Sequence, residues 1–501
     1  MTLPESSEVV VVGGGTAGAV VAARLAEAGM EVLVLEAGPD PGPFGDRRWP
    51  ADLVDATRLG TSYDWGFDSG ATYDGQLVRF ERARVLGGCS AHNGAVQTWG
   101  HRSDYDEWAG LGNSGWAADD LLPLFQRASE TLRVRTYDVG ELTPWQRAWY
   151  DAAPAVGLPQ LRNLNDLDET VGIAPESVNI VDGVRWNTAF AYLDPMRERL
   201  AIAGDALVDR VLVERGRARG VELAGGERVE AGIVVLAAGT FCTPAVLLRS
   251  GVGPPDALAQ LGVAVESPLP GVGENLHDQP FVLVTWEGSD EIRAAMDRAA
   301  AGGWAPDEQV MAKAATSADP GVFDLHLLPY SPTHLGDGRT FHAGAAALRP
   351  RSRGRVVLAS RDPEALPLVD HGFLTDDEGR DAAALAEGVA LLREIAAQPR
   401  LRRLLGRELV PGPDVTDIGA YARAHVDCYW HPVGTCRMGP AGDPGAVVDA
   451  RGQVHGVEGC YVADCALMPF IPRATTMLPA VVVAERVAEL LITTSAPGTP
   501  P

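Results

Sequence analysis

The chain has 501 residues, of which 46% are hydrophobic and 22% charged, so it can bury a large core divided among two or three packed domains. Its formal net charge of −25 disfavours nucleic acid and anionic lipid as partners. No run reaches the roughly 18 apolar residues of a membrane span. No basic leader precedes the first apolar run, and we expect a cytoplasmic protein.

The cysteines form no C-x-x-C pair, and their spacing matches no zinc site. We expect reduced, buried thiols and no metal centre. The six cysteines are Cys89, Cys242, Cys428, Cys436, Cys460 and Cys465.

The first predicted elements form a β-α-β unit. Residues 8–12 (EVVVV) are a short β-branched run bounded by glycine, which is typical of a buried parallel strand. Residues 17–28 (AGAVVAARLAEA) have helical spacing and stop at Gly29, and residues 31–35 (EVLVL) predict a second strand.

Later segments are read in the same way. Residues 40–80 are rich in Pro, Gly, Asp and aromatics and predict irregular chain, whereas residues 206–236 predict several short strands. Residues 380–405 predict a helix, residues 479–492 a closing helix, and residues 494–501 a disordered tail.

A glycine-rich turn follows the first strand and fits G-x-G-x-x-G. Gly13 permits the tight turn, Gly15 lets backbone approach a pyrophosphate, and Gly18 lets the helix pack close to the strand. The helix N-terminus directs a partial positive charge at the phosphates. Glu36 ends the second strand, 18 residues after Gly18, and can accept hydrogen bonds from both ribose hydroxyls of an adenosine. A dinucleotide is predicted, with NAD and FAD both open.

Four ordered blocks make the chain similar to the glucose–methanol–choline (GMC) flavoprotein oxidoreductases, nearest to choline oxidase-like members. The second block departs from the family pattern only at Cys89, where a small Gly, Ser or Thr is usual. The blocks are VVVVGGGTAGAVVAARLAEAGMEVLVLEAGP at 9–39, RVLGGCSAHNGAV at 84–96 with DYDEWAGLGNSGW at 104–116, GTFCTPAVLLRSGVG at 239–253 with GVGENLHDQP at 271–280, and HPVGTCRMG at 431–439 with VVDARGQVHGVEGCYVADCALMP at 447–469.

This resemblance implies FAD, held by the glycine turn and by small residues of the second block, which allow close backbone approach. It also implies a backbone contact from Val211 to adenine and a contact from Asp464 near the flavin. The expected cofactor residues are Gly13, Gly15, Thr16, Ala17, Gly18, Glu36, Ala37, Arg84, Gly87, Gly88, Ser90, His92, Asn93, Gly94, Val211, Ala238, Gly239 and Asp464.

The resemblance also implies the fold. We expect a mixed α/β chain whose Rossmann-like FAD-binding domain carries an inserted substrate-binding domain, built on a mainly antiparallel sheet with helices. The expected division is 1–119, 191–280 and 426–493 for the FAD-binding domain, 120–190 for a partly substrate-facing connection, 281–425 for the substrate-binding domain, and 494–501 for the tail.

His92 has a specific expectation. In choline oxidase-like members the stretch G-G-C-S-x-H-N carries a histidine bonded covalently to the flavin, and residues 87–93 here show the same residue types in the same order. We therefore expect a histidyl–FAD bond at His92. The alternative is a histidine that only packs or hydrogen-bonds beside the ring.

Alcohol oxidation by a flavin needs a group that accepts the hydroxyl proton while hydride moves to flavin N5. His431 stands where the family keeps its catalytic histidine, and we expect it to be this base or to stabilise the alkoxide. The family's second active-site residue, Asn or His, is replaced by Met477. A thioether donates no hydrogen bond, so this change bears on substrate and rate. His277 and Gln279 also exchange the usual order of Gln and His, which we interpret as variation behind the site.

The expected activity is oxidation of a small or medium alcohol, such as a sugar or amino alcohol, with O₂ or another electron acceptor, in a chain that can form a homo-oligomer. Trp65, Trp430 and Glu308 are candidate pieces of a cation site, but no charged anchor stands out in the sequence. Two alternatives stay open: a non-redox hydroxynitrile lyase-like enzyme with a structural flavin, favoured by Met477, and a flavin-binding partner without activity.

Overall fold

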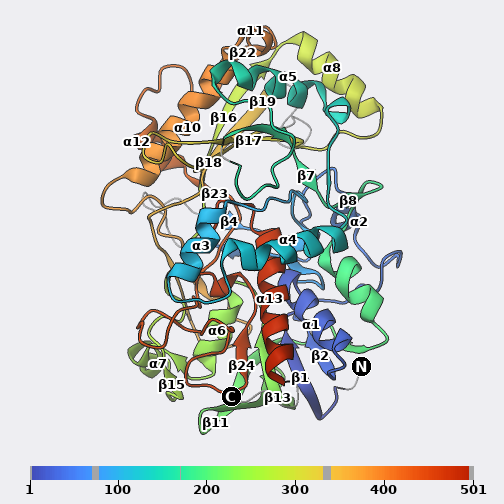
Figure 1. Cartoon of the computed structure of the whole chain (residues 1–501), viewed down its shortest axis with the longest axis vertical. Coiled ribbons are helices and arrows are strands. Elements are labelled where there is room, and N and C mark those ends of the chain that lie inside the picture. The colour runs from blue at the N-terminus through green and yellow to red at the C-terminus, as the bar shows by residue number, and fades with distance from the viewer. Residues whose placement is uncertain (1–2, 70–77, 170, 331–339, 496–501) are drawn as a thin grey trace.

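The computed structural model describes residues 3–69, 78–169, 171–330 and 340–495. The chain forms two lobes, each built around a large sheet, which lie one above the other in Figure 1. The first strands and the last helix both lie in the lower lobe, so the chain leaves that lobe and returns to it. The predicted mixed α/β class is confirmed.

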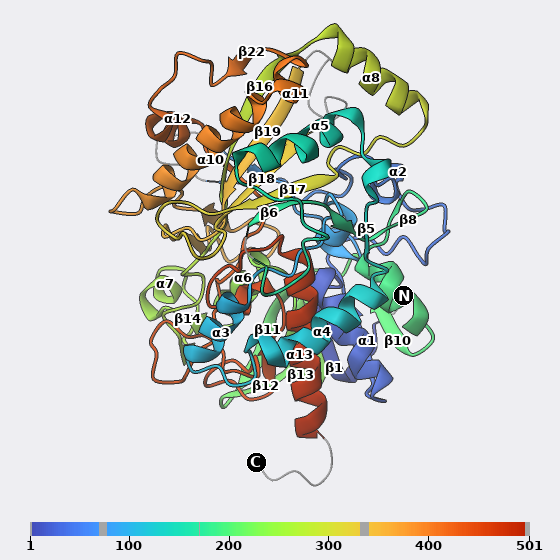
Figure 2. The ribbon, with the colours of Figure 1, turned by 45° about the horizontal axis from the view of Figure 1, so that its top comes forward.

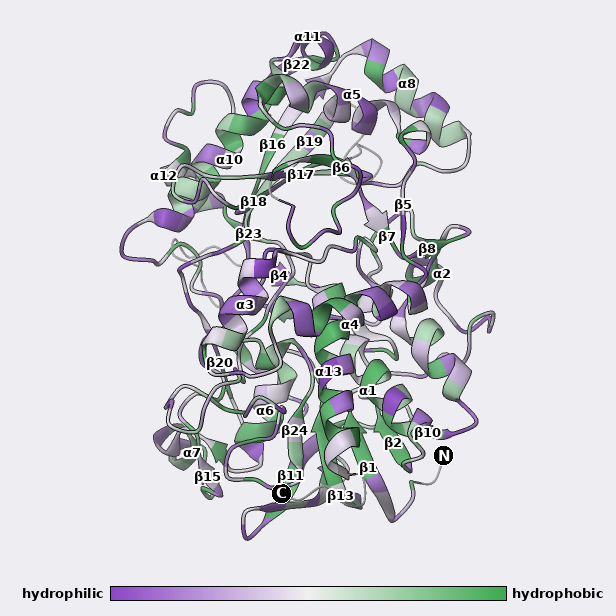
Figure 3. Ribbon diagram, in the orientation of Figure 1, coloured by the Kyte–Doolittle hydropathy of each residue, from purple (hydrophilic) through white to green (hydrophobic). Residues whose placement is uncertain are grey.

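The sheet of the lower lobe has a parallel centre. β1 pairs in parallel with β2 and β13, and β10 and β24 extend this pairing, whereas β12 and β11 continue it antiparallel. Its central strands are apolar on both faces, as a covered parallel sheet requires; Figure 3 shows them as hydrophobic. The strands are β10 (Leu200–Ala203), β2 (Val32–Leu35), β1 (Ser6–Val12), β13 (Arg228–Leu236), β24 (Cys460–Val462), β12 (Arg217–Leu223) and β11 (Val208–Glu214).

Three helices of this lobe pack together beside the sheet (Figure 1). The fully buried Glu485 carboxylate accepts hydrogen bonds from Arg24, Arg127 and Tyr192, which joins all three helices through one charged group. The helices are α1 (Thr16–Glu27), α4 (Ala118–Thr131) and α13 (Met477–Ser495).

The sheet of the upper lobe is antiparallel throughout, in the order β22-β16-β19-β18-β17-β6, with β23 also paired to β16. Side chains alternate between its faces. Val282 and Val284 pack under helices, whereas Phe281 and Leu283 face the lower lobe's side. The strands are β22 (Leu405–Val410), β16 (Pro280–Gly288), β19 (Thr340–Ala347), β18 (Leu325–Tyr330), β17 (Val310–Ala314), β6 (Gly172–Pro175) and β23 (Asp427–Cys428).

Helices cover the outer face of this sheet, as Figure 2 shows. Large apolar side chains such as Trp145, Trp149 and Leu392 fill the layer between helices and strands. The inner face is thereby left for the region between the lobes. The covering helices are α5 (Pro144–Ala152), α8 (Asp290–Ala301), α10 (Arg380–Ala396), α11 (Pro399–Arg402) and α12 (Ile418–His425).

Shorter elements connect the lobes. They are α2 (Ala51–Val54), β3 (Phe67–Asp68), β4 (Arg79–Phe80), η1 (Gly88–Ala91), α3 (Arg102–Gly110), β5 (Arg135–Thr136), η2 (Val139–Glu141), η3 (Ala153–Val156), β7 (Ser177–Val178), β8 (Ile180–Val181), β9 (Val184–Arg185), η4 (Ala189–Leu193), η5 (Asp194–Met196), α6 (Cys242–Arg249), β14 (Val252–Gly253), α7 (Pro255–Gln260), β15 (Ser267–Pro268), β20 (Arg355–Val357), β21 (Leu368–Asp370) and η6 (Cys465–Leu467).

Two predicted helices have different bounds. The helix expected over 380–405 ends at Ala396, because Pro399 cannot continue it and instead opens α11, and Leu405 already belongs to β22. The closing helix runs from Met477 to Ser495, so the tail expected from 494 starts too early. Residues 496–501 of that tail, and 70–77 of the irregular stretch, lie outside the described residues.

The expected domain boundaries do not coincide with the elements. The boundary after residue 119 falls inside α4, and the edge strand β6 of the upper sheet comes from the 120–190 connection. Strand β23, in the stretch expected to return to the lower lobe, pairs with β16. The assignment of each segment to a domain stays a prediction.

Candidate functional site

The turn between β1 and α1 is built as tightly as the sequence predicts. Gly13 has φ +93°, which favours glycine. A Cβ on Gly18 would lie 1.9 Å from the carbonyl oxygen of Gly13, so α1 can approach the strand only because residue 18 has no side chain. The first residues of α1 then line a cavity.

The second block packs against this turn. A Cβ on Gly88 would lie 2.7 Å from the Cα of Gly15, so the two glycine segments are in backbone contact. The N–H of Ser90 donates to the Thr16 hydroxyl at 3.1 Å and fixes the two segments to each other. Two loops far apart in sequence thus form one wall of small residues.

Glu36 lies at the end of β2, at the edge of the same cavity. Its carboxylate accepts the N–H groups of Gly14 and Gly38, each at 2.8 Å. Burial raises the pKa of Glu36, and the two backbone hydrogen bonds oppose that shift. The side chain is therefore fixed by its own turn and still borders the cavity, as an adenosine-ribose acceptor must.

Asp464 closes the opposite side of the cavity. Its carboxylate accepts the N–H of Gly239 at 2.8 Å, the Thr243 hydroxyl at 2.6 Å and the N–H of Ala466 at 2.8 Å. Burial raises its pKa. The carboxylate joins the segment before α6 to the segment before α13, and Asp464, Ala238 and Gly239 all line the cavity.

The cavity has a volume of about 630 Å³ and lies between the lobes, bordered by Leu35 of β2 below and by Leu283 and Met311 of the upper sheet. Most predicted cofactor residues line it. These are Gly13, Gly15, Thr16, Ala17, Glu36, Ala37, Gly88, Ser90, His92, Asn93, Gly94, Ala238, Gly239 and Asp464.

Four predicted cofactor residues do not line the cavity. Gly18 and Gly87 act only through the backbone geometry of their turns. Arg84 donates to the carbonyl oxygen of Ala37 at 3.1 Å and lies with its guanidinium 4.5 Å from the ring centre of Trp65, a lining residue. The fourth is Val211.

The structure does not support the predicted adenine contact of Val211. Its N–H donates to the Ser250 hydroxyl at 2.8 Å, away from the cavity. Leu207 and Val208, at the start of β11, line the cavity instead. The sequence could not separate these positions, because the pairing of β11 with β12 is irregular between Val208 and Arg210.

His431 lines the cavity, and its orientation is determined by Gln279. The Gln279 Nε2 lies 3.2 to 3.5 Å from three carbonyl oxygens, those of Leu348, Pro472 and Ala474. Since the NH₂ group faces acceptors, Oε1 is the atom that lies 2.7 Å from His431 Nδ1, and it accepts a proton from that nitrogen. The neutral ring therefore carries its lone pair on Nε2.

The charge state of His431 follows from its burial. Burial lowers the pKa of His431 to about 4, with Asp278 opposing and Arg82 reinforcing the shift. Asp278 also accepts the backbone N–H of His431 at 2.9 Å. At neutral pH the imidazole is unprotonated and able to accept a proton.

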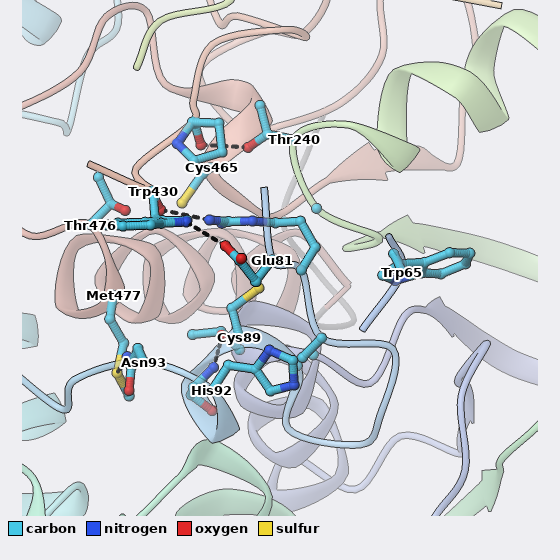
Figure 4. A pocket seen from close by; sticks show the side chains of 18 of the residues that line it. Trp65, Glu81, Cys89, His92, Asn93, Thr240, Trp430, Cys465, Thr476 and Met477 are labelled. Carbon is cyan, nitrogen blue, oxygen red and sulfur yellow. Dashed lines mark hydrogen bonds between the residues drawn. The ribbon is translucent and has the colours of Figure 1, made fainter. Parts of the chain in front are cut away.

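Met477 lies across the cavity at the first position of α13. Its sulfur accepts Nδ2 of Asn93 at 3.0 Å and Nε2 of Gln97 at 3.1 Å. Figure 4 shows Met477 beside Asn93. The thioether is held between two amide donors but donates nothing itself.

His92 lies on the wall formed by the second block. Its Nε2 is 2.6 Å from the carbonyl oxygen of Ser62, so that nitrogen carries the proton, and its buried Nδ1 has no hydrogen-bond partner in the described part of the chain. Burial lowers the pKa of His92. The ring is thus neutral, with a free lone pair on Nδ1.

The expectation of buried thiols is correct for only three of the cysteines. Cys428, Cys436 and Cys460 are buried, whereas the other three are partly exposed and line the cavity. Figure 4 shows the sulfurs of Cys89 and Cys465 directed into it. Burial raises the pKa of Cys242 to about 12, which keeps that thiol protonated.

No helix among the described residues has the length and apolar character to cross a bilayer. Within the same ranges, no group of three or more His, Cys, Asp and Glu side chains is arranged to hold a metal ion.

Comparison with known proteins agrees with this geometry. The description "GMC oxidoreductase" matches residues 7–281 and 350–484. The oxygen-dependent choline dehydrogenase of Photobacterium profundum is 31% identical over 96% of this chain and 92% of its own, and that of Chromohalobacter salexigens is 33% identical over 96% and 94%. The crystal structure of pyridoxine 4-oxidase from Mesorbium loti has a TM-score of 0.85 with 28% identity, covering 97% of this chain and 99% of that one.

The chain belongs to the GMC oxidoreductase family. It is an FAD-dependent oxidoreductase of this type that acts on CH–OH groups.

Sequence reasoning missed the second layer of the site. Gln279 was interpreted as variation behind the site, yet it determines the tautomer of His431. Glu176, a fully buried carboxyl near the cavity, lies in no motif. The only signal for either was an unusual polar residue in an otherwise apolar stretch, which does not say what it contacts.

Proposed function

We propose that this enzyme oxidises an alcohol with FAD bound in the cavity between the lobes and His431 as the proton acceptor. The observation that carries the proposal is the neutral His431 ring, whose Nδ1–H is fixed by Gln279 and whose Nε2 is free to accept a proton. When bound, FAD supplies the hydride acceptor, its N5 atom.

The residues present fit FAD. Two glycine segments in backbone contact leave room for a pyrophosphate, and the N-terminus of α1 adds favourable partial charge there. Glu36 would bind the adenosine ribose, and Leu207 and Val208 would border the adenine. Ser90, Asn93 and Asp464 would lie toward the flavin end. The remaining residues of the predicted set would support these contacts through backbone geometry.

His431 would bind the substrate hydroxyl through Nε2 and remove its proton as the C–H bond breaks. Gln279 would keep Nδ1 protonated throughout, so the ring does not turn or change tautomer. Met477 can shape the cavity beside the substrate but cannot hold its oxygen. The substrate oxygen would therefore depend more on His431 than it does where an amide or imidazole stands in place of Met477.

His92 would form the covalent bond to FAD. Its unpartnered Nδ1 supports this, because a buried nitrogen lone pair without a donor is otherwise unfavourable. The test is acid precipitation of the purified protein. Yellow colour in the pellet is expected; colour released to the supernatant would contradict the bond. His92→Ala should release the colour.

O₂ is proposed as the electron acceptor, since the curated relatives compared above are described as oxygen-dependent. Turnover should consume O₂ in proportion to alcohol oxidised, measured with an oxygen electrode. Turnover only with an added dye acceptor would contradict this part.

The central test is anaerobic mixing of the enzyme with a panel of alcohols while the flavin absorbance is recorded. Bleaching by at least one alcohol is expected. Turnover of a cyanohydrin without bleaching would instead favour the lyase-like alternative, which Met477 keeps open because lyase chemistry needs no hydride transfer. Neither result over a broad panel would indicate a binding protein without activity.

A further inference from the structure

Beyond His431, one end of the cavity forms a chamber roofed by the inner face of the upper sheet. We call it the carboxyl chamber and define it by Tyr137, Phe281, Glu308, Met311, Tyr330 and Tyr429, all of which line the cavity. The ring of Tyr429 lies 4.4 Å from the ring of His431, so the chamber begins directly beside the proposed base.

Glu308 contributes a carboxylate to this chamber from the segment before β17. A Cβ on Gly94 would lie 2.5 Å from Glu308 Oε1, so the carboxylate packs directly on the backbone of residue 94. Gly94 follows Asn93, which binds the sulfur of Met477. Glu308 therefore lies within the cavity wall that also holds the active-site segment.

Glu176 lies behind Glu308. Its N–H donates to the carbonyl oxygen of Gln309 at 2.8 Å, and its own carbonyl oxygen accepts from the N–H of Tyr137 at 3.0 Å. The side chain is fully buried, and neither carboxyl oxygen has a hydrogen-bond partner in the described ranges. A buried carboxyl without partners is costly and needs a physical explanation.

The electrostatics of the chamber are dominated by these two carboxyls. Burial and the Glu308 charge raise the pKa of Glu176, and burial together with the same two carboxyls raises the pKa of Tyr429. Arg135, a cation beside the chamber wall, lies 5.0 Å from the ring of Tyr137 but forms a paired ion contact with Glu141. Two adjacent carboxyls in such a place favour holding one proton between them, with one net negative charge.

We infer that the carboxyl chamber binds the protonated amine of an amino alcohol whose hydroxyl reaches His431, with Glu308 as the anionic partner. Tyrosine faces around it add cation–π attraction. The orphaned carboxyl oxygens require hydrogen-bond donors, which an ammonium with N–H groups supplies and a quaternary ammonium lacks. The inference rests on the proposed alcohol oxidation and specifies its substrate class.

The preference follows from the cost of unpaired groups. A site built to hydrogen-bond a substrate group rejects an analogue without it, because the buried polar atoms then stay unpaired. A neutral alkanol would leave the carboxyl pair without a cation, and a trimethylammonium group would leave its oxygens without donors. Amino alcohols should therefore exceed both analogues of the same length in rate of flavin reduction at low substrate concentration, by about tenfold or more.

The first experiment uses the holoenzyme and matched trios of alcohols with chains of two to five carbons. Each trio contains the amino alcohol, its trimethylammonium analogue and the neutral alkanol, and the rate of anaerobic flavin reduction is measured. Faster reduction by the amino alcohol at its best length supports the inference. Equal or faster reduction by the neutral or the trimethylammonium analogue would overturn it.

The second experiment separates this inference from the proposed function, since it needs no turnover. Butylamine, which has no hydroxyl, is titrated into the oxidised holoenzyme while the flavin difference spectrum is recorded. Saturable binding of butylamine with no alcohol oxidised would defeat the proposed function alone. Alcohol oxidation without butylamine binding would defeat the inference alone.

Variants locate the effect. Glu308→Gln should weaken butylamine binding about tenfold, which corresponds to about 1.4 kcal/mol. Gly94→Ala should weaken it as well, because the added methyl group displaces the carboxylate without removing its charge; Gly94 has no positive φ, so alanine fits its backbone. Glu287→Gln, an exposed carboxylate on β16, is the matched control and should leave binding unchanged. Unchanged binding in both cavity variants would overturn the assignment of Glu308.

Discussion

The imidazole of His431 is held by one acceptor, and that acceptor is itself held by three carbonyl groups. This arrangement makes the ring a base with an amide oxygen, rather than a carboxylate, accepting from Nδ1. The pKa of about 4 means that the ring need not lose a proton before it can act at neutral pH.

Replacement of the base tests its role directly. His431→Ala should slow anaerobic flavin reduction by about 10²-fold or more, because general base catalysis is lost. Stopped-flow absorbance measures the rate. His425→Ala, an exposed histidine on α12, is the control and should behave as the unchanged enzyme. Reduction at a near-normal rate in the His431 variant would remove it from the chemistry.

The pH dependence should reflect the lowered pKa. The proton-accepting form of His431 is lost only as the pH falls through about 4, so flavin reduction should be nearly flat between about pH 6 and 9. An unperturbed histidine would instead lose half its effect near about pH 6.5. Rates measured across this range would contradict the assignment if they doubled around that pH.

Gln279 should act as a positioning residue. Gln279→Leu removes the acceptor of Nδ1–H, so the tautomer is no longer fixed, and flavin reduction should slow about tenfold. Gln279→Glu keeps an acceptor but favours the imidazolium, which raises the pKa of His431. The low-pH loss of rate should then move to higher pH. A purely structural role would change the melting temperature without moving the pH profile.

At the scale of elements, the contact between α1 and β1 determines whether a phosphate can lie at the helix N-terminus. This contact depends on a missing side chain, because a Cβ on Gly18 would collide with backbone rather than with a flexible group. Backbone cannot move aside without displacing the turn that holds Glu36.

Gly18→Ala should therefore separate the helix from the strand. We expect about 1–3 kcal/mol of lost stability from overpacking and a protein that retains little FAD. Flavin content per chain and chemical denaturation measure the two effects. Gly110→Ala is the matched control, because a Cβ at the end of α3 would have no atom within 4 Å. Full flavin content in the Gly18 variant would show that the close approach is not needed.

At the scale of the whole molecule, the cavity lies between two sheets that contribute opposite walls. A cofactor bound there contacts both lobes, so its binding energy stabilises the whole folded chain. The effect is visible only when the cofactor can leave.

His92→Ala should make FAD removable if the covalent bond forms at that residue. The melting temperature of the FAD-free variant should rise on adding FAD, with about 2.7 kcal/mol gained at a hundredfold excess over Kd. Differential scanning calorimetry measures the shift. FMN, which lacks the adenosine half, should give a smaller rise. No dependence on FAD would place the cofactor outside the cavity between the lobes.

The sequence by itself determined the features that depend on local geometry. The β-α-β unit, the glycine turn and the acid at its end follow from residue types at fixed short spacing, since hydrogen bonds and sterics within about thirty residues decide them. The family blocks added the position of His431 and His92.

Only the tertiary structure decided what depends on pairing between distant segments. The contact of Gln279 with His431, the register that brings Val208 rather than Val211 to the cavity, and the position of Glu176 behind Glu308 each join residues from different strands or loops. Sheet pairing and loop packing set these neighbours, and no spacing along the chain encodes them.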